Sequence, residues 1–306
     1  MSFISILFAL LLEQARPLGQ LNPVHNTNRS WVRWVLRNFD AGQTPHGWLA
    51  WSLAVLLPSV LACAVFWLLM ATLGWLAAMV WNIAVLYVTL GFRQFSHHFT
   101  LIRDALLAGD EGLARQKLAE WMRMDASALP RSEIVRHVIE YSALSAHRHV
   151  FGVLAWYSVL SALGLGPAGA VFYRIAEYVG RYVKRPQQPT GAQISPAFQF
   201  CANRAWYLAD WVPVRLTALG FAFVGSFEEA VDSWRQYAAR YPEDNDGVVL
   251  AATAGAINVQ LGEADRGSAG QTPQTVHLRA FVGLVWRTVV MWMVILVLLS
   301  LARLLG

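Results

Sequence analysis

The sequence predicts an all-α polytopic membrane protein, and three observations lead to this fold class. Of the 306 residues, 56% are hydrophobic and only 14% are charged, so the chain is too apolar for an ordinary soluble domain. Several uncharged segments are long enough to cross a bilayer as helices. Tryptophan collects near the ends of these segments, as it does at membrane–water interfaces, at Trp48, Trp51, Trp75, Trp81, Trp286 and Trp292. We expect about three full transmembrane helices, a re-entrant helical pair and a cytoplasmic helical layer.

The charges and cysteines exclude several classes of protein. The formal net charge is +5, but no basic run alternates with aromatic residues, so we expect no nucleic-acid partner. Cys63 and Cys201 are too few for a disulfide framework or a metal site. Arginines between apolar segments instead favour a fixed orientation in the bacterial inner (cytoplasmic) membrane, crossed several times. The lipid bilayer is the expected partner, and no pattern in the sequence identifies a protein partner.

Residues 1–46 are predicted to form an N-terminal half-span and a basic cytoplasmic segment. The run from Phe3 to Leu12 is apolar but shorter than a full crossing, which indicates a retained half-span or an interfacial helix. A cleaved signal peptide is the weaker alternative, because the run lacks a basic leader and a small-residue cleavage site. The basic residues that follow are Arg16, Arg29, Arg33 and Arg37.

Residues 47–92 are predicted to form a transmembrane hairpin. No charged residue occurs between Gly47 and Phe92, and at a rise of about 1.5 Å per residue this stretch can cross a core of about 30 Å twice. Gly74 is the natural break, which gives helices over 48–71 and 75–92, and Pro58 should kink the first of them.

The next two regions differ in polarity. Residues 93–148 mix charged residues with apolar residues at helical spacing, which predicts a cytoplasmic helical hairpin that turns at 109–112, followed by a helix toward Glu140. Residues 149–185 are more apolar and are broken at 164–167 by Gly and Pro. Basic residues flank both ends of this region, so we predict a re-entrant pair with both ends in the cytoplasm.

Residues 186–278 are predicted to be membrane-associated helices and loops, with a Pro-rich loop at 186–196, helices at 226–241 and 247–261, and a linker at 262–273. Residues 279–306 are predicted to form the C-terminal transmembrane helix. Arg287 and Arg303 lie near the two ends of its apolar run, where long side chains reach the interface.

Two charged residues lie within the apolar stretch 204–225. Asp210 and Arg215 are costly in such a setting, and they are consistent with either a polar ligand-binding cavity or a structural pair of interfacial anchors. By contrast, His97, His98, His147 and His149 do not predict a metal site, because neighbouring residues point to different sides of a helix and no further ligand motif is present. Familiar nucleotide-binding and nucleophile motifs are also missing.

The order of several short segments is more informative. Residues 102–140 form the mixed helical stretch, Tyr173-Arg174 precedes the motif DWVPVR at 210–215, and NDG at 245–247 precedes an Ala- and Gly-rich helix. In this order they resemble the CobD/CbiB superfamily, the membrane-bound adenosylcobinamide-phosphate synthases of cobalamin assembly. The corresponding family motifs read Tyr-Lys, Asn-Trp-Ile-Pro-Ala-Arg and Asn-Ala-Gly, and the resemblance covers most of the chain.

The acidic positions of that family are replaced in this sequence. The family's Ala-Glu-Asn-Thr-x-Asp reads ALSAHR at 143–148, its Asn-Thr-Leu-Asp reads EYVG at 177–180, and its paired Asp is replaced by Trp206-Tyr207. An amide-forming enzyme that uses ATP needs carboxylates to hold Mg²⁺ and to neutralise phosphates. The loss of these acids therefore argues against the standard activity of the family.

A second branch of the superfamily also resembles this chain. AmpE, an inner-membrane family associated with β-lactamase induction, is similar over residues 210–216, in the following helix with Gly225, and in the early Glu13 and Leu18. That branch is regarded as a signalling modulator without established catalysis. The resemblance implies an AmpE-like protein that senses a ligand or modulates signalling.

These arguments give one prediction and two alternatives. The prediction is a cavity for a small-molecule or corrinoid ligand, with no cofactor, no metal and no assigned catalytic residue, lined by Arg136, Glu140, Tyr173, Arg174, Asp210 and Arg215. The first alternative is a divergent adenosylcobinamide-phosphate synthase that uses ATP and Mg²⁺, with Asp125 and Glu140 as surviving acids. The second is a structural membrane protein in which these charges are interfacial anchors.

Overall fold

The computed structural model describes residues 2–15, 23–184, 194–262 and 270–305, and over these ranges it is helical. The chain forms α-helices and one π-helical turn, and over the same ranges the β-structure is limited to an isolated parallel bridge between Val259 and Gln271. The helices cluster into two compact units. Unit 1 comprises Met1–Gly91 and Gly152–Pro213, and unit 2 comprises Phe92–Phe151 and Val214–Gly306.

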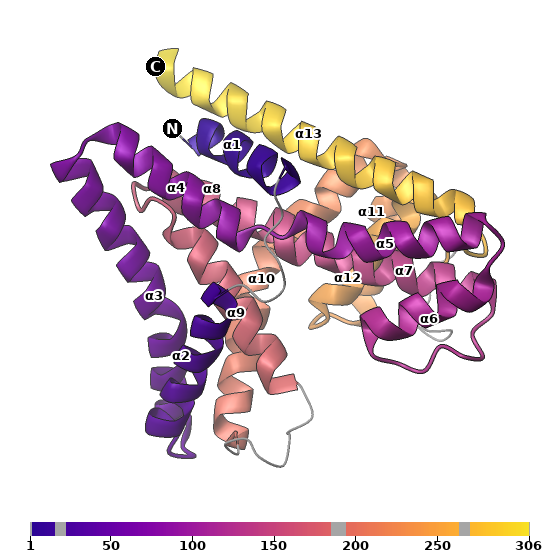
Figure 1. The fold of residues 1–306 in the computed structure, drawn as a ribbon, viewed down its shortest axis with the longest axis horizontal. Helices are drawn as coiled ribbons and strands as arrows, with labels where there is room; N and C mark the ends of the chain where they lie inside the picture. The colour runs from indigo at the N-terminus through magenta and orange to yellow at the C-terminus, as the bar shows by residue number, and fades with distance from the viewer. Residues whose placement is uncertain (1, 16–22, 185–193, 263–269, 306) are drawn as a thin grey trace. The chain divides into compact units, whose positions relative to one another are not determined.

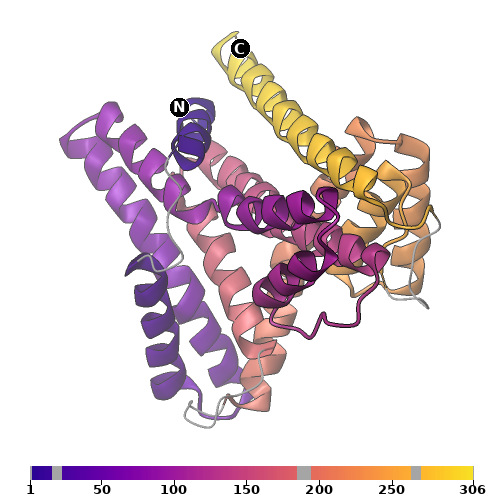
Figure 2. The same ribbon diagram turned by 45° about the vertical axis from the view of Figure 1, so that its right-hand side comes forward.

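Unit 1 is built around a long helical hairpin (Figure 1). Its helices are α1 (Ser2–Ala15), α2 (Pro23–Phe39), α3 (Thr44–Thr72), α4 (Trp75–Thr89), α8 (Gly152–Ala162), α9 (Ala168–Lys184) and the first part of α10 (Pro196–Val224). Two indole N–H groups bind the neighbouring helices to α3: Trp31 of α2 donates to the carbonyl of Ala54 at 3.2 Å, and Trp81 of α4 donates to that of Ala62 at 3.0 Å. Helix α1 packs along α4, as Figure 2 shows.

Unit 2 is a layer of shorter helices together with the C-terminal helix. Its elements are α5 (Phe92–Leu107), α6 (Glu111–Met122), α7 (Arg131–Ala146), the π-turn η1 (His147–Phe151), the end of α10, α11 (Phe227–Arg240), α12 (Asn245–Ile257) and α13 (Thr275–Leu305). Helices α11 and α12 lie side by side (Figure 1) because Gly255 permits backbone contact: a Cβ there would lie 2.3 Å from the carbonyl oxygen of Glu229.

Three helices in the described ranges are long and apolar enough to cross a membrane: α3 over Thr44–Thr72, α10 over Pro196–Val224 and α13 over Thr275–Ala302. The expected number of about three is confirmed, but the set differs from the prediction. Helix α4 ends at Thr89, and its 15 residues rise about 22 Å, short of a core of about 30 Å. Helix α10, predicted only as membrane-associated, has the required length.

The predicted breaks occur at the expected glycines. Gly74 separates α3 from α4 with a φ of 81°, and Gly164 and Gly166 separate α8 from α9 with φ of 82° and 54°, a region that glycine adopts at little cost. Gly166 also lies against the ring of Phe66, since a Cβ added at Gly166 would be 2.5 Å from a ring carbon. The re-entrant course of α8 and α9 stays a prediction. Residues 185–193 of the Pro-rich loop and 263–269 of the linker lie outside the described residues.

Candidate functional site

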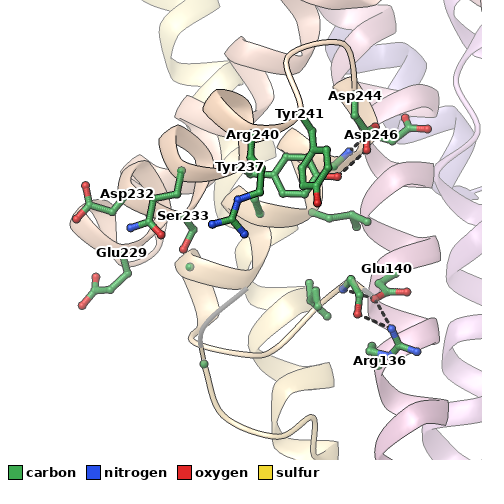
Figure 3. Close-up of a pocket in the computed structure, with 18 of the residues that line it drawn as sticks. Arg136, Glu140, Glu229, Asp232, Ser233, Tyr237, Arg240, Tyr241, Asp244 and Asp246 are labelled. Carbon is green, nitrogen blue, oxygen red and sulfur yellow. Dashed lines mark hydrogen bonds and ion pairs between the residues drawn. The ribbon is translucent and has the colours of Figure 1, made fainter. Parts of the chain in front are cut away.

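A polar pocket of about 650 Å³ lies within unit 2, between α7, α11 and α12 (Figure 3). Its charged lining contains five carboxylates and two guanidinium groups, so negative charge is in excess. These residues are Glu140, Glu229, Asp232, Asp244 and Asp246, with Arg136 and Arg240. Such a wall favours a ligand that carries a positive charge or several hydrogen-bond donors.

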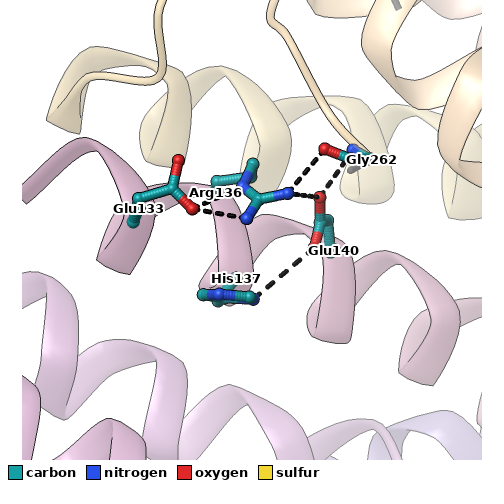
Figure 4. Close-up of polar contacts among 5 residues, drawn as sticks. All are labelled: Glu133, Arg136, His137, Glu140 and Gly262. Atoms are coloured by element: carbon teal, nitrogen blue, oxygen red, sulfur yellow. Dashed lines mark hydrogen bonds and ion pairs between the residues drawn. The ribbon is translucent and has the colours of Figure 1, made fainter. Parts of the chain in front are cut away.

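Arg136 and Glu140 bind the two backbone polar groups of one residue, Gly262 (Figure 4). Nη1 of Arg136 donates to the carbonyl oxygen of Gly262 at 2.5 Å, and Oε1 of Glu140 accepts from the Gly262 N–H at 2.7 Å. The two side chains are four residues apart on α7, so they face the same side, and Nη1 of Arg136 lies 3.6 Å from Oε1 of Glu140. Glu133 also accepts from Nε of Arg136 at 3.0 Å.

His137 lies beside this network but adds no positive charge to it. Its Nδ1 is 3.7 Å from Oε2 of Glu140. Burial lowers the pKa of His137, and the attraction of Glu140 opposes this shift only in part. The imidazole is therefore neutral at pH 7, and Arg136 is the charged partner of Glu140 in this cluster.

The opposite wall of the pocket is fixed by the start of α12. Asp244 caps this helix by accepting from the N–H of Gly247 at 3.0 Å, and the hydroxyl of Tyr237 donates to its other oxygen at 2.6 Å. Gly247 leaves room for the Tyr237 ring, because a Cβ would lie 2.1 Å from a ring carbon. The side chain of Tyr237 is thus held against the pocket by α12.

Two further contacts reach the first turn of α12. Arg148, in the π-turn η1, forms an ion pair of 2.5 Å with Asp246. Arg215 of α10 donates to Oδ1 of Asn245 at 3.1 Å. The neighbouring His147 is fully buried and lies 2.9 Å from the hydroxyl of Thr217. Single π-turns within helices are frequent at functional sites.

Unit 1 contains a separate buried polar pair. The hydroxyl of Tyr173 on α9 donates to Oδ1 of Asp210 on α10 at 2.7 Å. Gly152 of α8 makes room for the phenol ring, since a Cβ there would lie 2.1 Å from it. The next turn of α9 contains Glu177, which is 1% exposed and pairs with both Arg174 and Arg181.

Comparison with known proteins identifies the family of this chain. The family model described as CobD/Cbib protein matches residues 6–280. The chain belongs to the CobD/CbiB family.

Three relatives of this CobD/CbiB family member are each named cobalamin biosynthesis protein CobD. The protein from Stutzerimonas stutzeri is 32% identical over 274 residues, which cover 83% of this chain and 82% of that protein. The protein from Chromobacterium violaceum is 31% identical over 60% of this chain and 56% of its own length, and the one from Leptospira interrogans is 28% identical over 62% and 59%. No solved structure gives a significant match. These names do not support the AmpE-like signalling interpretation, which stays a prediction.

The six predicted ligand residues of this CobD/CbiB protein divide between the two units. Unit 2 contains Arg136, Glu140 and Arg215, of which the first two line the polar pocket; unit 1 contains Tyr173, Arg174 and Asp210. Two pairs within the set are in contact: Arg136 forms an ion pair with Glu140 (Figure 4), and Tyr173 donates a hydrogen bond to Asp210. A single cavity lined by all six stays a prediction.

Other residues of the site were not selected from the sequence. Arg148 and Asp246 lie in the family-like segments 143–148 and 245–247, but neither is among the six predicted ligand residues; their ion pair joins positions 98 residues apart. The signal that could have linked them is the replacement of the family's acids at 143–148 by a basic residue. Asp125, a candidate acid of the synthase alternative, is exposed, accepts the N–H of Ser127 at 2.9 Å, and is not in the pocket lining.

Proposed function

We propose that this protein acts in cobalamin biosynthesis as a divergent adenosylcobinamide-phosphate synthase. The observation that carries the proposal is the similarity to cobalamin biosynthesis protein CobD of Stutzerimonas stutzeri, which extends over 83% of this chain and 82% of the relative. The match to the family model extends over residues 6–280, which include the pocket residues of unit 2. The ligand would be a corrinoid, bound by a protein that crosses the bacterial inner membrane several times.

The polar pocket of unit 2 is suited to one part of amide formation. An amine is a cation at neutral pH and must lose a proton before it attacks a carbonyl carbon. The carboxylates of Asp232, Asp244 and Asp246 would attract the cation. Asp232, on the exposed face of α11, is then free to accept the proton, whereas Asp244 and Asp246 are already engaged by Tyr237 and Arg148.

Arg136 and Glu140 would act as ligand-binding and positioning residues in this proposal. Both side chains line the pocket and hold Gly262, so a ligand that contacts Gly262 would meet a fixed backbone. Arg215, which donates to Asn245 at the start of α12, would also bind the ligand in this proposal. Tyr173, Arg174 and Asp210 lie in unit 1 and are not part of this pocket, so their role in ligand binding stays a prediction.

The family activity implies ATP and Mg²⁺, and the residues described here fit them poorly. Within the described ranges, no three His, Cys, Asp or Glu side chains converge to hold a metal ion. Mg²⁺ can bind through one or two carboxylates and substrate phosphates, but the negative wall of the pocket would repel a nucleotide without its metal. We therefore derive no step through either group.

A ligand-sensing protein is the second candidate, and one contact favours it. Arg148 stands within the segment where the synthases have acids, and it pairs with Asp246 at the start of α12. A cation there neutralises one pocket carboxylate and so weakens the attraction of the pocket for a cationic substrate or a metal. A sensor needs the pocket but not the lost acids.

Growth of a bacterial strain that lacks its own synthase separates these candidates. We expect the wild-type gene to restore corrinoid-dependent growth and Glu140→Gln or Asp232→Asn to reduce it. Glu228→Gln, on α11 outside the pocket lining, is the matched control and should behave as wild type. Failure of a well-expressed wild-type protein to restore growth would contradict the proposal and favour the sensor.

A further inference from the structure

A second cavity lies entirely within unit 1 and differs from the polar pocket in its chemistry. It has a volume of about 470 Å³ and is bounded by α3, α4 and α9, with Asn28 contributed by α2. Its walls are largely aliphatic, formed by side chains such as Leu61, Val65, Val85 and Val88. Small-molecule sites have volumes of about 300–1,000 Å³ and mostly apolar walls, so this cavity is large enough for a chain-like ligand.

Two guanidinium groups face this apolar cavity. Arg174 and Arg181 are among its lining residues, and the lining contains no carboxylate within the described part of the chain. Glu177 pairs with both arginines, at 3.1 Å from Nη1 of Arg174 and 2.9 Å from Nη2 of Arg181, but it is not itself part of the lining. Two cations therefore share one buried anion, and the group has a net charge of +1.

The position of α2 places the cavity near charged surface. Trp31 bonds α2 to Ala54 of α3, four residues before the cavity begins at Pro58. On α2, Arg29 and Arg33 are exposed. Charged side chains beside a membrane-spanning helix lie at the headgroup level, with their stems along apolar surface. The cavity thus combines an apolar interior with two lining arginines, and its lining residue Asn28 is next to the exposed Arg29 of α2.

We propose that this cavity binds one anionic phospholipid, with an acyl chain between α3, α4 and α9 and the headgroup phosphate on Arg181 and Arg174. Arginine binds phosphate through paired N–H donors, and basic pockets between membrane helices bind anionic headgroups. A neutral lipid would leave the net charge unbalanced, and a free phosphate would leave the apolar walls exposed to water. This inference does not depend on the proposed cobalamin function.

The test uses the full chain, purified and delipidated in detergent, with dioleoyl phosphatidylglycerol as the probe and dioleoyl phosphatidylcholine as its neutral counterpart. Binding is followed by native mass spectrometry and by the thermal unfolding midpoint. Arg181→Gln removes a headgroup contact, and Arg33→Gln is its control on the exposed face of α2. Ala84→Phe fills the cavity, whereas Ala64→Phe adds the same ring to an exposed position on α3 outside the lining.

The wild type and both controls should bind phosphatidylglycerol more tightly than phosphatidylcholine and unfold at a higher temperature with it. Arg181→Gln should weaken this binding about fivefold, the order expected for one arginine near an anionic surface, and Ala84→Phe should abolish it. Equal binding of the two lipids, unchanged binding in Ala84→Phe, or an equal stabilisation by inorganic phosphate alone would overturn the proposal. The two variants change charge and volume separately, so misfolding of one leaves the other as a test.

Discussion

The hydroxyl of Tyr173 donates a 2.7 Å hydrogen bond to Asp210, and both side chains are fully buried. The bond joins α9 to α10 within unit 1, between residues of two separate sequence motifs, Tyr173-Arg174 and DWVPVR at 210–215. Tyr173→Phe should lower the free energy of unfolding by about 1–3 kcal/mol, because a buried polar group loses one partner. Thermal unfolding in detergent measures this. Tyr182→Phe is the control, since the hydroxyl of Tyr182 has no hydrogen bond within the described residues, and an equal effect of both variants would contradict the account.

Gly152 should be intolerant of even a methyl group. A Cβ at this position would lie 2.1 Å from the ring of Tyr173, so Gly152→Ala must displace the phenol from Asp210. The expected loss is about 1–3 kcal/mol or more, as for an overpacked core. Gly283→Ala in α13 has no neighbour within 4 Å and should be neutral or slightly stabilising. The unfolding midpoints of the two variants should therefore shift in opposite directions or by clearly different amounts.

Glu140 should control the local stability of Gly262. Its carboxylate accepts the Gly262 N–H at 2.7 Å, so Glu140→Ala should speed hydrogen exchange of this amide, while Glu140→Gln, which keeps an oxygen acceptor, should have a smaller effect. Exchange measured by mass spectrometry on a peptide ending at Gly262 distinguishes the two. Similar exchange in Glu140→Ala and the control Glu228→Ala would show that the contact does not hold the backbone.

Acidic pH should destabilise unit 2 through His137. Burial lowers the pKa of this imidazole in the folded protein, so the native state binds fewer protons than the unfolded state. The stabilisation is complete above the ordinary histidine pKa of about 6.5 and is lost as the pH falls through the lower value of the folded state. Unfolding midpoints between pH 7.5 and 5 should fall less steeply in His137→Gln than in wild type. Replacement of the exposed His46 by Gln should leave the slope unchanged.

The helices that local composition determines were the ones predicted most closely. The long uncharged run gave α3 and its break at Gly74, and the last apolar run gave α13. The length of α10 was underestimated because Arg204, Asp210 and Arg215 interrupt its apolar pattern. In the structure, Asp210 accepts a hydrogen bond from Tyr173, and Arg215 donates one to Asn245. A hydropathy pattern cannot reveal that a charge has a partner in another helix.

The candidate site shows the same limit more strongly. The spacing of Arg136 and Glu140 places them on one face of a helix, but their common partner, Gly262, is more than 120 positions away. The Arg148–Asp246 pair likewise depends on tertiary packing. Sequence motifs therefore selected residues that take part in polar contacts, whereas the contacts themselves required the fold.

The measurement that tests the cobalamin proposal most directly is the chemical one. Corrinoids extracted from a synthase-deficient strain that expresses this protein can be analysed by liquid chromatography and mass spectrometry. We predict a new corrinoid amide product that is absent from the empty-vector strain and reduced in the Glu140→Gln and Asp232→Asn variants. An unchanged corrinoid profile, with the wild-type protein present in the membrane fraction, would contradict a synthase function.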